Sequence, residues 1–182
     1  MLETFAQFSC KAPLGANAAV SLHLTSNQER AMPAIHRILC PVDFSETSER
    51  ALQYAVALAR QFGAGIHLVH VWQMPVYAFP DGAVILGPDV VAEITNEMQR
   101  SLDAMIARHK EPELVIEGHL MQGVPDREVA RMANQLNAEL IVMGTHGRTG
   151  ISHMLLGSVA ERVVRTSTVP VLTVPPDRTK HK

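Results

Sequence analysis

The stretch IHRILCPVDFSETSERALQYAVALARQFGAGIHLVHVW, residues 35–72, sets the pattern that the rest of the chain repeats. It begins with a short apolar run, Ile35 to Val42, which is typical of a buried strand. A helix is predicted next, with Ser45 or Thr47 as its cap and apolar residues recurring at every third and fourth position. A second apolar run, Gly65 to Trp72, follows. The stretch therefore predicts a strand–helix–strand unit.

The same alternation continues through the rest of the chain. A long loop, Gln73 to Pro88, leads to another amphipathic helix, and further helices are predicted to start at Pro125 and Ser158. The remaining strands are expected at Leu114 to Met121, Leu140 to Met143 and Val169 to Val174. Strands that alternate with helices form parallel sheets with right-handed crossovers. The sequence thus predicts a single doubly wound, Rossmann-like α/β domain with a five-stranded parallel sheet and helices on both faces.

Composition restricts the classes of protein that the chain can belong to. It has 182 residues, 47% of them hydrophobic, and a net charge of -2, which suits a globular domain and argues against a basic nucleic-acid binder. No apolar run approaches the roughly 20 residues that a bilayer requires, so no membrane partner is predicted. The two cysteines, Cys10 and Cys40, fit neither a disulfide framework nor a zinc motif. A reducing compartment, the cytoplasm, is the expected location.

The N-terminal residues depart from this pattern. Residues 1–33 are predicted to be an extension that is poorly ordered or loosely docked, because their apolar positions follow no clear period. The folded domain is expected to cover residues 34–176, and residues 177–182 are expected to form a C-terminal tail.

The segment between the fourth strand and the last helix carries the clearest functional signal, because ligands of such sheets bind outside the carboxyl ends of the strands. It contains four glycines, which let a ligand approach the backbone closely: Gly144, Gly147, Gly150 and Gly157. Ser158 and Glu161 have the spacing of a capping box, so amide groups at the helix start would point into the segment. The pattern predicts an anion site, with a mobile glycine-rich surface loop as the alternative.

Other phosphate and metal motifs are missing or incomplete. The chain has no Gly-Lys-Ser/Thr and no Gly-x-Gly-x-x-Gly after the first strand, which excludes a P-loop NTPase and disfavours an NAD enzyme. His67 and His70 are three apart in a strand and would point to opposite faces, so no metal site is predicted. His146 lies inside the glycine-rich segment, where it could donate to a phosphate or only cap the turn.

Gly144-x-x-Gly147, followed by nine residues and Gly157-Ser158, resembles the nucleotide-binding signature of the universal stress protein family. Arg37 to Ser45 is similar to the first strand and turn of that family, and His70-Val71 to the end of its second strand. Gly123-Val124-Pro125 is similar to its third loop. The resemblance covers about residues 35–175.

The resemblance implies a member of the ATP-binding branch, with ATP as ligand together with Mg²⁺. By motif, the adenine and ribose contacts would fall on Pro41, Val42, Asp43, Val71, Gly123 and Met143, and the phosphate contacts on Gly144, Gly147, Arg148, Gly157, Ser158 and Val159. No catalytic residue and no protein metal ligand is assigned. Members of the family commonly dimerise through the last strand, which implies a homodimer through Val169 to Val174.

These features together favour a regulatory or stress-protective protein that acts as an ATP-dependent switch with at most slow hydrolysis. From Gly144 to Ala160 the sequence has no Asp or Glu to activate water, and Arg148 is its only permanent cation. The alternative is a slow ATPase or an autophosphorylating phosphotransferase, and a flavin or adenylate-derivative binder is the third possibility. The downstream protein partner and the inducing stress are not indicated by the sequence.

Overall fold

The computed structural model describes residues 34–74, 77–79, 82–84, 87–147 and 156–177. The predicted N-terminal extension, Arg148 and residues 178–182 of the predicted tail lie outside the described residues. The division into extension, domain and tail therefore stays a prediction.

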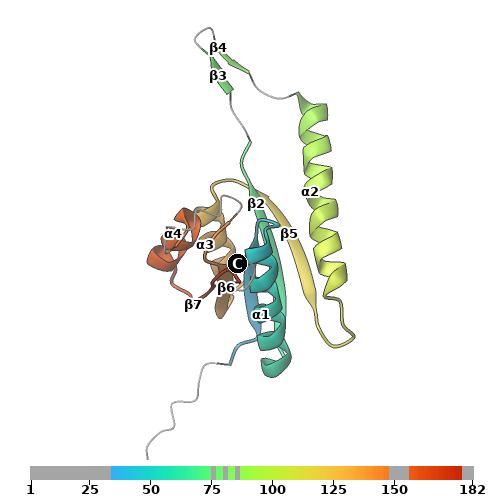
Figure 1. Ribbon diagram of the computed structural model, residues 1–182, viewed down its shortest axis with the longest axis vertical. Coiled ribbons are helices and arrows are strands. Elements are labelled where there is room, and N and C mark those ends of the chain that lie inside the picture. Colours follow the sequence, from blue (N-terminus) through green and yellow to red (C-terminus); the bar gives the residue numbers. More distant parts are fainter. Residues whose placement is uncertain (1–33, 75–76, 80–81, 85–86, 148–155, 178–182) are drawn as a thin grey trace, which may run out of the picture. The chain divides into compact units, whose positions relative to one another are not determined.

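Five strands form one parallel sheet, as predicted (Figure 1). In spatial order the sheet is β5-β2-β1-β6-β7, so that β1 lies at its centre. The strands are β1 (Arg37–Val42), β2 (Gly65–Trp72), β5 (Ile116–Gln122), β6 (Leu140–Gly144) and β7 (Val171–Val174). The chain runs outward from β1 to one edge and then returns to build the other side, which is the doubly wound arrangement expected from the sequence.

Helices cover both faces of this sheet and enclose a hydrophobic core on each. The helices α1 (Glu46–Phe62) and α2 (Pro88–Arg108) pack on the face that carries Ile38 and Leu68. The helices α3 (Pro125–Gln135) and α4 (Ser158–Thr166) pack on the opposite face, against residues such as Leu39 and Val69. Successive strand residues thus alternate between the two cores, as a buried parallel strand requires.

Local sequence signals account for most helix ends. The Ser45 hydroxyl accepts a hydrogen bond from the Ser48 amide at 3.2 Å and caps α1, and Gly63, at φ 66°, ends it in the left-handed conformation. Pro88 and Pro125 are the first residues of α2 and α3, where proline loses no helical hydrogen bond. None of the described helices has the length and apolar character needed to cross a membrane.

Three local expectations were wrong. The long loop after β2 contains a short antiparallel hairpin, β3 (Tyr77–Phe79) and β4 (Gly82–Val84). The predicted capping box at Ser158 does not form, because Gly157 is the N-cap and its carbonyl accepts from the Glu161 amide at 2.9 Å. The last strand starts at Val171 rather than Val169, and Pro170 precedes it with its carbonyl bonded to the Ile141 amide. β7 lies at the edge of the sheet, where a neighbouring proline is tolerated.

Candidate functional site

A cavity of about 280 Å³ lies at the carboxyl ends of β1 and β6, beside the start of α4. This is the position where the strand order reverses, at which ligands of doubly wound sheets bind. Its volume is close to the lower end of the roughly 300–1,000 Å³ typical of small-molecule sites. One wall is apolar, with side chains from three strands and from α3: Val42, Val69, Val71, Met143 and Val129.

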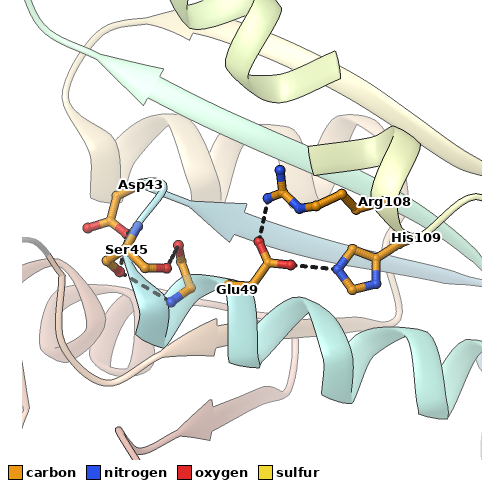
Figure 2. A network of polar contacts seen from close by, with 6 residues as sticks. Asp43, Ser45, Glu49, Arg108 and His109 are labelled. Atoms are coloured by element: carbon orange, nitrogen blue, oxygen red, sulfur yellow. Dashed lines mark hydrogen bonds and ion pairs between the residues drawn. The ribbon is translucent and has the colours of Figure 1, made fainter. Parts of the chain in front are cut away.

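Asp43, the first residue after β1, lies at the cavity and its carboxylate is held in place. The Ser45 amide and hydroxyl both donate to Asp43 Oδ1, at 3.1 and 2.6 Å (Figure 2). Phe44 adopts φ 64°, a left-handed conformation that costs a residue with a side chain roughly 1–2 kcal/mol. Its ring packs on the buried His70 ring with centroids 4.3 Å apart. The strained turn is therefore supported by packing, and it fixes Asp43 at the cavity.

Three glycines bring main chain close to parts of the cavity wall: Gly147 to this carboxylate, Gly144 to the start of α1, and Gly157 to the backbone of Thr145. A Cβ on Gly147 would lie 2.5 Å from Asp43 Oδ2, and one on Gly144 would lie 2.9 Å from Thr47 Cγ2. A Cβ on Gly157 would lie 3.0 Å from the Thr145 carbonyl oxygen. All three distances are shorter than ordinary contacts of a Cβ atom, so a larger residue would displace a side chain at Gly144 and Gly147 and would press on backbone at Gly157.

The first turn of α4 supplies amide groups to the same cavity. Ser158, Val159 and Ala160 line it, and the first N–H groups of a helix have no partner within the helix. The Gly157 amide differs, because it donates to the Thr145 carbonyl at 2.6 Å. The aligned peptide dipoles add a partial positive charge at this end of α4. The arrangement favours an anion next to the apolar wall.

A second polar cluster fastens α1 to the end of α2 (Figure 2). Arg108 Nη2 donates to Glu49 Oε2 at 2.8 Å, and His109 Nε2 lies 2.7 Å from Glu49 Oε1. Burial acts to raise the pKa of Glu49, but hydrogen bonds from His109 and Arg108 outweigh it and hold the pKa below its ordinary value. Glu49 is not among the residues that line the cavity at the ends of β1 and β6, and its bonds to Arg108 and His109 join α1 to the end of α2.

The structure brings most of the predicted site residues together. Of the predicted residues that the structure describes, all except Gly123 line the cavity, and Arg148 lies outside the described residues. Gly123 packs against α3, where its Cβ would lie 2.7 Å from Glu128 Cγ, and its amide donates to the Trp72 carbonyl. His146 lines the cavity, and its Nδ1 lies 2.9 Å from the Thr145 hydroxyl.

Sequence reasoning missed several residues that line the cavity: Ser48, Val69, Pro125, Val129, Thr145 and Ala160. Two of them carried a usable signal. Val69 is two residues from Val71 in the same strand and so shares its face, and Val129 belongs to the apolar face expected for α3.

Comparison with known proteins gives one consistent family. Residues 34–175 match the model of the Universal stress protein family. Universal stress protein MJ0531 of Methanocaldococcus jannaschii is 35% identical over 140 residues, which cover 76% of this chain and 81% of that protein. The solved structure of MJ0577 from the same organism is 26% identical, with a TM-score of 0.65 over 80% of this chain and 99% of that one. A universal stress protein solved in complex with cAMP is 25% identical, with a TM-score of 0.59 over 78% of this chain and 97% of that one.

Proposed function

The chain belongs to the universal stress protein family, and from this membership and the cavity we infer that it binds ATP, together with Mg²⁺, as a nucleotide-dependent regulatory or stress-protective switch. The observation that carries this proposal is the convergence of Asp43, three close-packed glycines and the start of α4 on one cavity. A similar family member solved with cAMP supports a purine nucleotide as the ligand class.

The apolar wall suits a purine base and Asp43 suits the ribose. Val42, Val71 and Met143 offer apolar surface against which a flat ring can pack. An ionised carboxylate only accepts hydrogen bonds, and ribose hydroxyls are donors. Because Ser45 fixes the orientation of the Asp43 carboxylate, ribose binding requires little additional ordering of this side chain.

The phosphates would lie toward α4. The amides of Ser158 and Val159 are assigned to them, and each favourable contact at a helix start contributes roughly 0.3–2 kcal/mol to anion binding. Gly144 and Gly147 let the main chain approach closely. The Gly157 amide already donates to the Thr145 carbonyl, so we assign Gly157 this role of close approach and not that of a phosphate donor. Arg148, which lies outside the described residues, is proposed as the phosphate-binding cation.

The donor set suits magnesium held mainly by phosphates. Asp43 is the one carboxylate among the described residues that line the cavity, and it is assigned to the ribose, so phosphate oxygens and water would supply most ligands of a Mg²⁺ ion bound with the nucleotide. When bound, the ion would neutralise part of the phosphate charge.

Hydrolysis is expected to be slow, because the site supplies anion binding without a group placed to activate water. No Asp or Glu occurs from Gly144 to Ala160, and Asp43, the one carboxylate among the described residues that line the cavity, is assigned to the ribose rather than to an attacking water. Rapid phosphoryl transfer depends on several cations acting together, and the 144–160 segment contains one arginine and no lysine. Binding and release of ATP, rather than its chemistry, would then set the state of the switch.

Incubation of the full chain with labelled ATP tests this proposal. Bound nucleotide, released phosphate and protein-linked label are counted separately. The switch predicts stoichiometric bound ATP with little of the other two products. Turnover near 1 per second, the low end for kinases, would contradict slow hydrolysis, and protein-linked label would establish the autophosphorylating alternative.

A homodimer is proposed through β7. This strand is an edge of the sheet, paired with β6 on one side, and its Leu172 side chain is 38% exposed. Backbone groups along a sheet edge are available for pairing with another strand. The cytoplasmic location also stays a proposal, and it fits the buried, unpaired thiol of Cys40.

A further inference from the structure

Three side chains of metal-ligand type converge on the edge strand β5 and its neighbour β2. His67 is paired with Glu117 across the two strands, and His119 is two residues further along β5 on the same face. Their potential ligand atoms all lie within 4.8 Å of one another. The cluster lies toward the amino ends of the strands, whereas the proposed ATP site lies at their carboxyl ends.

We propose that His67, Glu117 and His119 form a binding site for Zn²⁺, with a fourth position open to water. His67 Nδ1 lies 3.1 Å from His119 Nε2 and 3.4 Å from Glu117 Oε2. In a tetrahedral zinc site with ligand distances of roughly 2.0–2.2 Å, the ligand atoms are about 3.4 Å apart. The observed separations therefore accommodate the ion with small side-chain adjustments and no change of strand register.

The ligand types select among metals. Two imidazoles and one carboxylate suit zinc and neighbouring transition ions, whereas magnesium and calcium prefer oxygen ligands alone. Because Mg²⁺ is the ion proposed for the nucleotide site, the two sites are expected to differ in metal preference as well as in place.

The surrounding charges are compatible with a cation. Arg37 is the nearby positive group, and its guanidinium is paired with Glu139 at 2.9 Å. Glu117 contributes a negative charge within the cluster.

A bound ion would act as a clamp on the edge of the sheet. β5 is an edge strand in which Gly118, between the two ligands of this strand, contributes no side chain to the sheet. Among the described strands, β5 pairs only with β2. A metal ion that links Glu117 and His119 to His67 would therefore hold β5 to β2. A ligand that binds only the folded state raises its stability, so zinc should raise the unfolding temperature.

The test is titration of the chelator-treated full chain with Zn²⁺ alone, followed by calorimetry and by thermal unfolding. The expected result is one saturable site per chain and a higher unfolding temperature. Loss of a group that hydrogen-bonds a metal ligand typically weakens metal binding by roughly 10- to 100-fold. His119→Gln and Glu117→Gln each remove a proposed ligand itself, so each should weaken zinc binding by at least this factor. Glu117 is 59% exposed, so its variant reports on binding even where His119→Gln impairs folding.

His36→Gln is the matched control, because His36 is exposed and lies outside the cluster. Its zinc affinity should equal that of the original chain. Absence of saturable binding, or unchanged affinity in both Glu117→Gln and His119→Gln, would overturn the proposal. Mg·ATP titration of the same variants is a separate readout, which these substitutions should leave unchanged.

Discussion

Replacement of Gly147 by alanine should weaken ATP binding by displacing the Asp43 carboxylate. A Cβ at this position would lie 2.5 Å from Asp43 Oδ2, so one of the two atoms must move by roughly 1 Å to restore an ordinary contact. The carboxylate is the end of a side chain and moves more readily than the backbone. Its movement would disturb the hydrogen bonds that Oδ1 accepts from Ser45.

The expected magnitude follows from the hydrogen bonds that Asp43 is proposed to make with ribose. Loss of a hydrogen bond to a charged group costs about 1.5–3 kcal/mol, which corresponds to roughly a 10- to 150-fold weaker affinity. The free energy of unfolding should change less. The disturbed Ser45 bonds lower it, but replacing glycine by alanine raises it by about 0.4–1 kcal/mol through the unfolded state.

Calorimetric titration with Mg·ATP measures the affinity, and thermal unfolding confirms that the variant is folded. Gly87→Ala is the matched control, because a Cβ at Gly87 meets nothing within 4 Å. Asp43→Asn, Gly147→Ala and the double variant complete a cycle. If both substitutions act through the same carboxylate, the double variant should be little worse than Asp43→Asn alone. Wild-type affinity in Gly147→Ala, or strictly additive losses, would refute the reasoning.

Three further predictions concern stability and assembly. Glu49→Gln should lower the free energy of unfolding by on the order of 1 kcal/mol at neutral pH. The pKa of Glu49 is lowered in the folded state, so this difference in stability should be complete above about pH 5 and should shrink as the pH falls below the ordinary value of 4.5. Urea unfolding at neutral and at acidic pH measures it. Glu113→Gln, at an exposed site, is the control and should change the free energy of unfolding little at both pH values. Leu102→Ala should cost about 2–5 kcal/mol, because Leu102 is fully buried between α2 and the sheet, and Val115→Ala, at a side chain that is 61% exposed, should stay within about 0.5 kcal/mol. Leu172→Asp should weaken the proposed dimer in light scattering, and a wild-type mass that is monomeric at every concentration would contradict the dimer itself.

The fold was predictable because local patterns and the global arrangement agree. Buried parallel strands give apolar runs such as Gly65 to Trp72, and proline and glycine mark the helix ends at Pro125 and Gly63. The failures occurred where neighbouring residues compete for one role. Gly157 and Ser158 can both start α4, and the sequence does not show that the backbone contact with Thr145 places Gly157 at the cap.

The site was predictable as a set of segments and not as contacts. Alternation placed Asp43 and Gly147 at the same end of the sheet, but their close approach depends on how two loops fold over that edge. The zinc cluster was not predicted, because His67 and Glu117 are separated by 50 positions and their pairing depends on the register of β2 and β5. The available signal was Glu117-x-His119, since residues two apart share one face of a strand.

The most direct test of the proposed function is calorimetric titration of the full chain with Mg·ATP, beside Gly157→Val. A Cβ at Gly157 would lie 3.0 Å from the Thr145 carbonyl oxygen, a backbone atom that cannot easily move, so the larger side chain should distort the start of α4. The proposed function predicts saturable binding by the wild-type chain and none by a folded Gly157→Val variant. Absence of heat from the wild-type chain, or equal binding by both, would contradict it.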